Sequence, residues 1–406
     1  MSSKPVILIF IFLCVNISNV AASYERGPND VLIKRNGLPD FFKKINDHKP
    51  VTVAYLSGSI TEAPNGWRDF TQQWLKEKYP AANFKEVMAA IGGTGSDFGA
   101  YRLQEHVLKH NPDLVFIEFA VNDHDRKFED IQSSIEGIVR QIRRHNRFTD
   151  ICFVYTISIS LLKDYEKNIL PTSVKAMETI AARYGIPSVN FAPCILQKLE
   201  TKQLAFDNKN NPDSLPLFSE DGVHPVENGH RAYAATITDA LIKMSSRQKK
   251  FKHKLPVPLS INNLENARMI SLMDAGVIKT NGWIIDSNFA GGAFKNRIPI
   301  VLSTGNTADS IVYHFNGTAI GIADIMGPTS SKVRFVIDGK IYDRDRFDVF
   351  SSYYRTNYSI VDGLPKKQHT VVIKLSPDKP DKKKILPSGT SPDAHNLYIT
   401  YLLVSY

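Results

Sequence analysis

Hydrophobic and polar positions alternate in two different ways along this chain. Between residues 51 and 244, short apolar runs typical of strands alternate with longer stretches that have the apolar spacing of helices. The strands are predicted at Val51–Leu56, Phe84–Ala89, Leu114–Phe119, Ile151–Ile157 and Ser188–Phe191. The helices are predicted at Trp67–Lys78, Gly99–His110, Ile131–Arg144, Val174–Tyr184 and Val226–Met244. This alternation predicts a doubly wound α/β domain, in which a parallel sheet is covered by helices on both faces.

The pattern changes after Met244. From about Gly282 onward the helical spacing is absent, and short apolar runs are separated by turn residues. The strands are predicted at Ile300–Ser303, Ser310–Phe315, Ala319–Asp324, Val333–Ile337, Thr370–Leu375 and Leu397–Val404. Asp338-Gly339 stands between two such runs and predicts a hairpin. The sequence therefore predicts an all-β sandwich over residues 283–406, joined to the first domain by a basic, proline-containing linker at 247–282.

The N-terminus has the features of a cleavable signal peptide. Lys4 precedes an apolar run from Val6 to Val15, and Val20-Ala21-Ala22-Ser23 offers small residues for cleavage. The run is short for a membrane span, which makes an uncleaved anchor the weaker alternative. We therefore expect a signal peptide at 1–22, a first domain at 23–246, and a secreted or periplasmic protein. No later stretch is apolar enough to predict integral membrane association.

Composition adds little to this picture. The chain has 406 residues, 43% hydrophobic residues and a formal net charge of +9. Basic residues cluster at 247–254 and 379–384, but aromatic residues do not alternate with them and no nucleic-acid motif contains them. We interpret the clusters as solvated loops, with attraction to an acidic polysaccharide as the alternative, and expect no nucleic-acid partner.

The candidate chemistry lies beside the ends of predicted strands. Ser59 follows the first strand, Asn122 follows Leu114–Phe119, and Asp221-Gly222-Val223-His224-Pro225 precedes the last helix. A serine nucleophile needs a base, and the base needs an orienting acid, which His224 and Asp221 can supply. Taken singly, the serine could cap a helix and the aspartate–histidine segment could be a turn.

Two further segments bear on this chemistry. Gly92-Gly93-Thr94-Gly95-Ser96 follows the second strand and could present backbone N–H groups to an anion, although a plain strand-to-helix turn explains it equally well. Its spacing matches neither a dinucleotide fingerprint nor a P-loop. His124, next to Asn122-Asp123, is a competing candidate base that no other part of the sequence supports.

Taken together, the blocks around Ser59, Gly93, Asn122 and Asp221–His224 resemble the SGNH (GDSL-like) serine hydrolase family over roughly Val51 to Met244. The resemblance implies a flavodoxin-like fold, Ser59 as nucleophile, His224 as base and Asp221 as orienting acid. It also implies an oxyanion hole built from the backbone N–H groups of Ser59 and Gly93 and the side chain of Asn122. No metal or organic cofactor is implied.

This sequence departs from the family pattern at two positions. Ser57-Gly58 replaces the usual Gly-Asp before the serine, and Ala120 replaces the glycine of the third block. The first change puts substrate preference in doubt more than activity. The second is small, because the donor in that block is the Asn122 side chain.

The substrate is inferred from the rest of the chain. An export signal and an appended sandwich resemble the family's secreted carbohydrate acetylesterases, which indicates an acylated carbohydrate or another small ester as substrate. Trp67 is a tentative pocket residue that could wall an acyl site or stack on a sugar, or else be the first core residue of a helix. A lipid or short-chain acyl esterase is one alternative. A glycan-binding protein with an auxiliary hydrolase domain is another, with Tyr353, Tyr354 and Tyr358 as its stacking platform or else as core residues.

Overall fold

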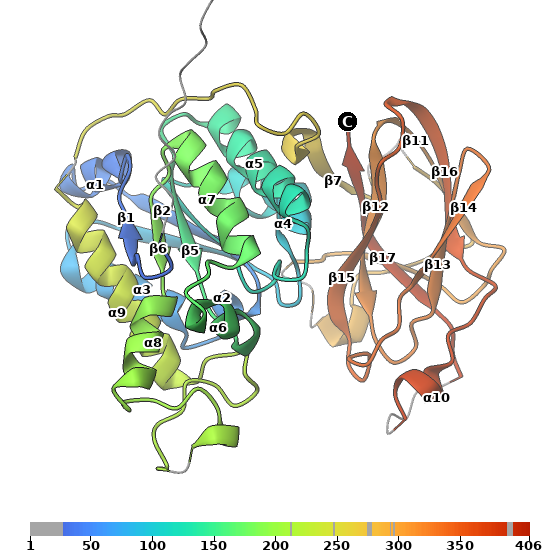
Figure 1. Ribbon diagram of the computed structural model, residues 1–406. Coiled ribbons are helices and arrows are strands. Elements are labelled where there is room, and N and C mark those ends of the chain that lie inside the picture. The colour runs from blue at the N-terminus through green and yellow to red at the C-terminus, as the bar shows by residue number, and fades with distance from the viewer. Residues whose placement is uncertain are drawn as a thin grey trace, which may run out of the picture.

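The computed structural model describes residues 27–406, apart from 212, 247, 274–277, 293, 295, 296 and 388–392. The predicted signal peptide therefore lies outside the described residues. Figure 1 shows an α/β domain beside a β-domain, in the order that the hydrophobic pattern predicts. Within the described residues, no helix combines the length and the apolar character that a membrane span requires.

A six-stranded sheet forms the centre of the first domain, in the order β1-β6-β5-β4-β2-β3. Strands β2 to β6 are mutually parallel and β1 runs antiparallel to β6, which matches the predicted flavodoxin-like arrangement. The bounds are β1 Leu32–Ile33, β2 Val51–Ser57, β3 Phe84–Ala90, β4 Leu114–Glu118, β5 Asp150–Tyr155 and β6 Ser188–Asn190. Every residue of β4 and β5 is buried, because both faces of a parallel sheet are covered by helices.

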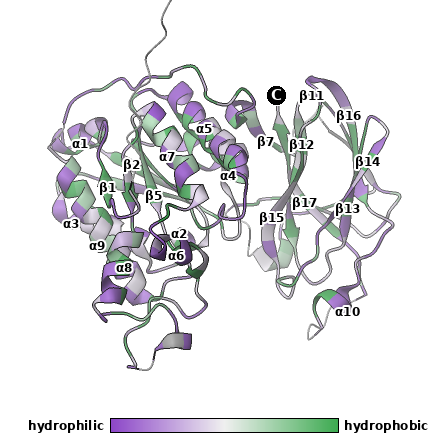
Figure 2. Ribbon diagram, viewed as in Figure 1, coloured by the Kyte–Doolittle hydropathy of each residue, from purple (hydrophilic) through white to green (hydrophobic). Residues whose placement is uncertain are grey.

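Helices cover both faces of this sheet (Figure 1). Helices α4 (Ser96–His106), α5 (Phe128–His145) and α7 (Thr172–Tyr184) pack side by side on one face. On the other face lie α1 (Pro39–Asn46), α3 (Trp67–Lys78), α8 (Ala192–Glu200) and α9 (Glu227–Met244). The shorter helices are α2 Ser59–Glu62, α6 Ile159–Glu166, η1 Leu108–His110 and η2 Asn208–Asn210. In Figure 2 strands β2 and β5 are mainly hydrophobic, whereas α3 and α5 alternate between polar and apolar residues.

Two antiparallel sheets form the second domain, which confirms the predicted sandwich. The first has the order β15-β12-β17-β10-β9, with β7 also paired to β17, and the second has the order β14-β13-β16-β11-β8. The bounds are β7 Ala267–Ser271, β8 Ile278–Asn281, β9 Ile284–Asp286, β10 Val301–Thr304, β11 Ser310–Gly317, β12 Ala319–Met326, β13 Lys332–Ile337, β14 Lys340–Asp345, β15 Arg355–Val361, β16 Lys367–Leu375 and β17 Leu397–Ser405, with η3 Leu264–Asn266, η4 Phe289–Gly292 and α10 Lys382–Ile385 between them. Asp338 and Gly339 both have positive φ, 49° and 85°, as the two-residue turn of a tight hairpin requires.

The segment predicted as a linker is ordered over most of its described length. Residues 248–266 lie against the first domain as an extended strap, which crosses the ends of its helices in Figure 1. The Glu136 carboxylate of α5 accepts the backbone N–H groups of Leu259 and Ser260 at 2.8 and 2.7 Å. Strands β7 and β8 already belong to the sandwich, so the linker expected at 247–282 is too long at its C-terminal end. The sequence did not predict that the strap at 248–266 packs on the first domain, because residues that hold it, such as Glu136, are more than a hundred positions away.

A continuous apolar core joins the two domains. Met269, Ala323 and Leu403 of the sandwich belong to the same buried cluster as the helices and strands of the first domain. Most of this contact is made by α4, which packs against β7 and β17. Burying apolar surface stabilises a contact by roughly 25 cal/mol per Å². This shared core therefore favours a fixed arrangement of the two domains over independent motion.

Candidate active site

Ser59 is the first residue of α2, immediately after the carboxyl end of β2. Gly58 is the N-cap residue and has an extended backbone, with φ −102° and ψ −158°. Carboxyl ends of parallel strands present the binding sites of open α/β sheets, so the serine lies where this fold places its chemistry. The side chain of Ser59 is half-buried.

His224 connects Ser59 to Asp221. The Ser59 hydroxyl donates to Nε2 of His224 at 2.9 Å, and Nδ1–H of His224 donates to Oδ2 of Asp221 at 2.6 Å. Oδ1 of Asp221 accepts the backbone N–H groups of Val223 and His224, each at 2.8 Å. The loop is also fixed from outside, because the Gly222 carbonyl accepts the Ile159 N–H of α6 at 2.8 Å. The three side chains thus form a hydroxyl–imidazole–carboxylate chain.

The electrostatics of this chain favour an ionised Asp221. Partial burial alone would raise the pKa of the Asp221 carboxyl, but hydrogen bonds from the His224 ring and from two backbone N–H groups outweigh it. The pKa of Asp221 is therefore held well below its usual range. The side chains of His224 and Asp221 remain 49% and 55% exposed, so the site opens directly to solvent.

Asn122 and the glycine segment lie next to Ser59. A Cβ atom at Gly58 would lie 2.1 Å from Oδ1 of Asn122, so the Asn122 side chain packs directly on Gly58. A Cβ atom at Gly92 would lie 3.4 Å from Cβ of Ser59. Gly93 has φ +69°, a conformation that favours glycine, and it is exposed. The four predicted blocks therefore converge at one edge of the sheet.

Trp67 is not a pocket residue. It is the first residue of α3 and is 0% exposed, packed against Tyr55, Phe116 and Phe191. Its indole N–H donates to Oγ1 of Thr61 at 3.2 Å. The tentative assignment of Trp67 to the substrate pocket is wrong, and the alternative of a core residue at a helix start is right.

The other candidates, three tyrosines and His124, do not lie together and do not contact Ser59. Tyr358 stacks on Phe98 of the first domain, with ring centroids 4.7 Å apart, while Tyr354 packs against Phe289. Only Tyr353 of the three tyrosines is strongly exposed, at 58%, so they do not form a shared stacking platform. His124 contacts the Val121 carbonyl and the Asp125 carboxylate, at 2.8 and 3.0 Å, and its ring nitrogens have these partners instead of Ser59.

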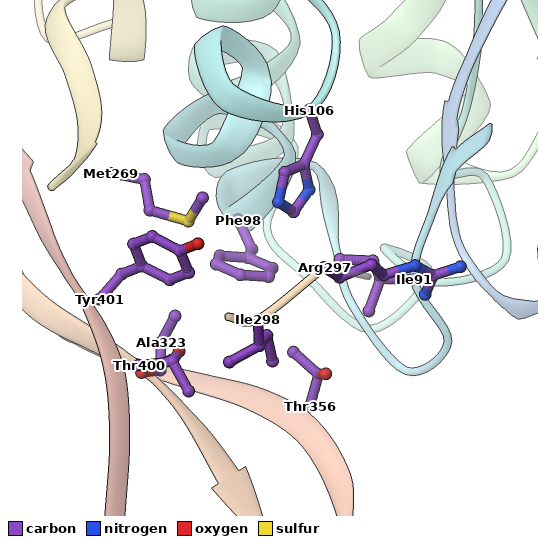
Figure 3. Close-up of a pocket in the computed structure, with 10 residues that line it drawn as sticks. All are labelled: Ile91, Phe98, His106, Met269, Arg297, Ile298, Ala323, Thr356, Thr400 and Tyr401. Atoms are coloured by element: carbon purple, nitrogen blue, oxygen red, sulfur yellow. Dashed lines mark hydrogen bonds between the residues drawn. The ribbon is translucent and has the colours of Figure 1, made fainter. Parts of the chain in front are cut away.

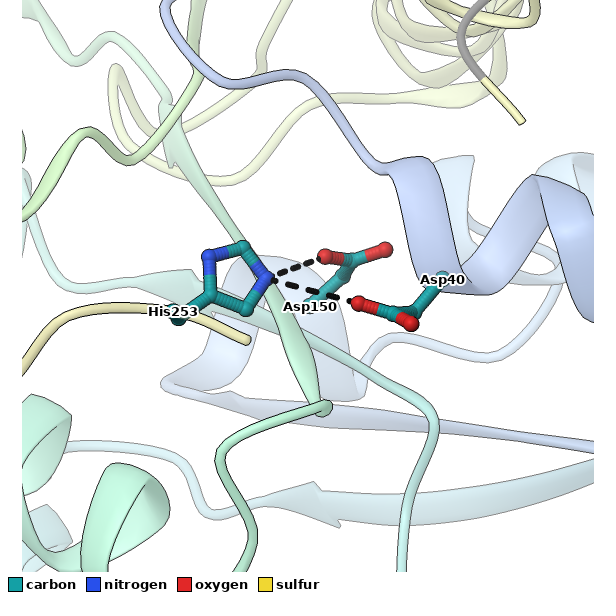
Figure 4. A group of neighbouring side chains, drawn as sticks. All are labelled: Asp40, Asp150 and His253. Atoms are coloured by element: carbon teal, nitrogen blue, oxygen red, sulfur yellow. Dashed lines mark hydrogen bonds and ion pairs between the residues drawn. The ribbon is translucent and has the colours of Figure 1, made fainter. Parts of the chain in front are cut away.

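One group of side chains in the described part of the chain could hold a metal ion. Asp40, Asp150 and His253 bring their ligand atoms within 4.8 Å of one another (Figure 4). Asp150 is the first residue of β5, so the group lies at the opposite edge of the sheet from Ser59. Nε2–H of His253 donates to Asp150 at 2.7 Å, and backbone N–H groups of Phe41 and Phe251 donate to Asp150 and Asp40. With the Arg143 charge also beside Asp150, the group acts as a pin between the strap, α1 and β5.

Two cavities lie away from the catalytic residues. One, of about 10 Å³, lies between the domains and is lined by side chains such as Phe98, His106 and Arg297 (Figure 3). It has room for about one water molecule. Burial lowers the pKa of His106 to about 3, so this imidazole is neutral. The other, about 360 Å³, is lined by α8, α9 and the loop between them and includes none of Ser59, Asp221 or His224.

Comparison with known proteins identifies the first domain. Residues 54–232 match the GDSL-like Lipase/Acylhydrolase family. The first domain belongs to this family. The matched range contains Ser59, Gly93, Asn122, Asp221 and His224, and this domain is thus an acylhydrolase domain of the SGNH type. No curated protein matches the sequence.

Solved structures extend the similarity to both domains. A two-domain esterase (CEX) active on acetylated mannans is 21% identical, with a TM-score of 0.74 over 92% of this chain and 97% of its own. The same esterase co-crystallized with mannopentaose gives 20% identity and a TM-score of 0.70, over 89% and 92% of the two chains. The acylhydrolase domain and its sandwich therefore share the fold of that esterase over nearly their whole length.

Two residues beside the site were not among those predicted from the sequence. Glu62 lies one helical turn after Ser59, and its carboxylate accepts the Gly92 N–H at 2.7 Å. Arg297, from the sandwich, donates to the other oxygen of Glu62 at 2.6 Å. The position of Glu62 in Ser59-Ile60-Thr61-Glu62 was a signal for its nearness to the serine, but nothing in the sequence brings Arg297 there.

Proposed function

We propose that this protein is a serine esterase that removes O-acetyl groups from carbohydrate. The observation that carries the proposal is the position of His224, within hydrogen-bond distance of both Ser59 and Asp221 at 2.9 and 2.6 Å. Nucleophile, base and orienting acid have this arrangement in serine hydrolases on unrelated folds.

The proposed reaction has two steps. His224 takes the Ser59 proton as the serine oxygen attacks the acetyl carbonyl, and the resulting oxyanion accepts hydrogen bonds from Ser59 N–H, Gly93 N–H and the Asn122 side-chain amide. The intermediate collapses as His224 returns the proton to the departing sugar oxygen, which leaves an acetyl-Ser59 ester. Water, deprotonated by His224, then releases acetate and restores the serine. One oxyanion donor is typically worth about 100- to 1000-fold in turnover.

Two observations support a carbohydrate ester over a long-chain lipid. His224 and Asp221 lie at an open surface, about half exposed, which a polymer can approach from solvent. The two-domain architecture also matches an esterase active on acetylated mannans in both domains.

A second candidate function, a glycan-binding protein with an auxiliary hydrolase domain, has less support. It would not require a hydroxyl–imidazole–carboxylate chain, and the three tyrosines suggested as its platform point into different environments. A lipid or short-chain acyl esterase uses the same triad and differs only in substrate.

Acyl-chain profiling separates these functions. Nitrophenyl acetate should be hydrolysed much faster than nitrophenyl decanoate, and acetate should be released from an acetylated mannan or xylan. A preference for decanoate would favour the lipid alternative. Wild-type protein that binds the polysaccharide but cleaves no ester would favour the binding alternative.

Export is a separate part of the proposal and rests on Lys4 and the apolar run Val6–Val15. Mass spectrometry of the protein recovered outside producing cells should find a new N-terminus near Ala22. Retention of the whole apolar run in membranes would favour the uncleaved anchor.

A further inference from the structure

The Glu62 side chain connects the glycine segment to the second domain. Glu62 is the last residue of α2, and its two oxygens have different partners. Oε2 accepts the Gly92 N–H at 2.7 Å, and Oε1 accepts a guanidinium N–H of Arg297 at 2.6 Å. Both charged side chains are only about a third exposed, at 32% and 33%. The pair is therefore partly shielded from solvent, and Glu62 lies beside Gly92.

Arg297 belongs to the sandwich and reaches across the domain boundary. Its neighbour Ile298 is buried with Val301, Ile325 and Tyr398 of the second domain. In Figure 3 the Arg297 side chain runs beside Ile91, the residue after β3. A second guanidinium N–H lies 3.3 Å from the Met88 sulfur of the same strand. The backbone of Arg297 thus belongs to the sandwich, and its guanidinium group contacts the acylhydrolase domain.

The far end of the glycine segment is held by the sandwich as well. The Tyr358 hydroxyl of β15 donates to Asp97 at 2.7 Å, and its ring stacks on Phe98 with an interplanar angle of 8°. Both contacts fall in the first turn of α4, directly after Gly95. Ser96 N–H in the same turn donates to Asp123, the residue after Asn122, at 3.1 Å. Residues 92–98 are therefore held at one end by Glu62, which pairs with Arg297 of the sandwich, and at the other end directly by Tyr358 of the sandwich.

Within the glycine segment Thr94 and Ser96 are buried, but Gly93 has no side-chain packing of its own. A Cβ atom at Gly93 would meet nothing within 4 Å, and the residue is exposed with φ +69°. Backbone without side-chain packing keeps one conformation only through its hydrogen bonds. The Gly92 N–H bond to Glu62 is such an anchor, and a charged partner keeps the carboxylate from turning toward water.

We propose that Glu62 and Arg297 are positioning residues that hold the backbone of Gly92 and Gly93 where the oxyanion forms, so that the second domain is part of the catalytic unit. This inference rests on the proposed function. Neither residue contacts the reacting atoms. Both act by fixing the position of the Gly93 N–H. A misplacement of about 1 Å can cost about 100-fold in rate, so a small shift of this segment is sufficient to lower turnover.

The test compares Arg297→Met and Glu62→Gln with a matched control. Arg334→Met removes an arginine of the same domain that pairs with Asp343 and Asp378 within the sandwich. For Arg297→Met, kcat on nitrophenyl acetate should fall about tenfold or more while KM changes by less than about twofold, because a donor used mainly in the transition state is displaced. Arg334→Met should leave both constants unchanged. The rate at which a nitrophenyl phosphonate labels Ser59 should fall in parallel with kcat.

Further variants separate positioning from loss of folding. Arg297→Lys keeps a cation near Glu62 and should recover part of kcat. Adding Glu62→Gln to Arg297→Met should cost little more than Arg297→Met alone, since the two residues act as one unit. A folded Arg297→Met protein with wild-type kcat would overturn the inference, as would equal losses in Arg297→Met and Arg334→Met. Failure of the proposed function is distinct, because wild-type protein would then show no turnover that depends on Ser59.

Discussion

Asn122 packs against Gly58 so closely that a Cβ atom on the glycine would lie 2.1 Å from the Asn122 Oδ1 atom. Gly58 stands where the family usually has an aspartate, and here the Asn122 side chain occupies the space that a side chain at position 58 would need. The departure from the family pattern at position 58 therefore lies in direct contact with the proposed oxyanion donor. Glycine at position 58 permits the close approach, and its backbone φ of −102° does not itself require glycine.

This contact predicts that Gly58→Ala acts through Asn122. The added methyl group should displace the Asn122 amide and lower kcat on nitrophenyl acetate by about 10- to 100-fold. This loss should not exceed the loss of kcat in Asn122→Ala. The double variant should lose no more than Asn122→Ala alone, because both changes remove the same donor. Full additivity of the two losses would contradict the contact as the cause.

The hydrogen bonds of Asp221 predict a simple acid limb in the pH profile of kcat/KM. The pKa of Asp221 is well below its usual range, so the carboxylate remains ionised while the activity is lost in acid. In acid the logarithm of kcat/KM should therefore fall with a slope of one, because Asp221 does not gain a proton in that range. A slope of two would show that Asp221 titrates in the same range. Asp221→Asn should lower kcat by about 100- to 10,000-fold while leaving the fold intact.

Glu118 predicts a pH dependence of stability that is independent of catalysis. It ends β4, is 1% exposed, and accepts hydrogen bonds from Thr156 and Thr61 at 2.7 and 3.1 Å. Burial raises the pKa of Glu118 to about 7, from an ordinary value of 4.5. The folded state then holds a proton that the unfolded state has released, so stability falls as pH rises from about 4.5 to 7.

The variant Glu118→Gln should remove this dependence. Relative to wild type, its free energy of unfolding should increase from pH 5 to pH 8 by up to about 3 kcal/mol, measured by urea unfolding. Glu77→Gln, which changes an exposed glutamate on α3, is the matched control. A difference between wild type and Glu118→Gln that is the same at both pH values would contradict the assignment.

The sequence predicted those elements whose stability is local. The apolar runs starting at Val51, Phe84 and Leu114 match β2, β3 and β4 at their first residues. Strands β2 and β4 are almost wholly buried and therefore mainly apolar, whereas β3 is an edge strand that exposes Lys85. The helix expected from Gly99 begins at Ser96, since Gly95 is extended and the Ser96 N–H has a partner in Asp123. The four-residue helix α2 and edge strands such as β9 and β15 were not predicted. Their conformation is stabilised by neighbouring segments and is not marked by an apolar pattern of their own.

The features that the sequence did not predict depend on contacts between segments that are far apart along the chain. The strap at 248–266 has the composition of a linker, and its order comes from Glu136 of α5 and from the Asp40–Asp150–His253 pin. Trp67 follows Asn65-Gly66 near the serine, yet its ring turns into the core. Ser59, Asp221 and His224 were expected together from their order along the chain, and the structure places them together. Their roles in catalysis stay predictions.

The central claim is that Ser59 is a nucleophile activated by His224, and turnover of nitrophenyl acetate by Ser59→Ala tests it most directly. With folding verified by circular dichroism, Ser59→Ala should lose about 10,000-fold or more in kcat, with a similar loss in His224→Ala. In wild type alone, a nitrophenyl phosphonate should lose nitrophenolate and leave its phosphonyl group on the peptide that contains Ser59. A folded Ser59→Ala protein that keeps more than about a tenth of wild-type turnover would contradict the account.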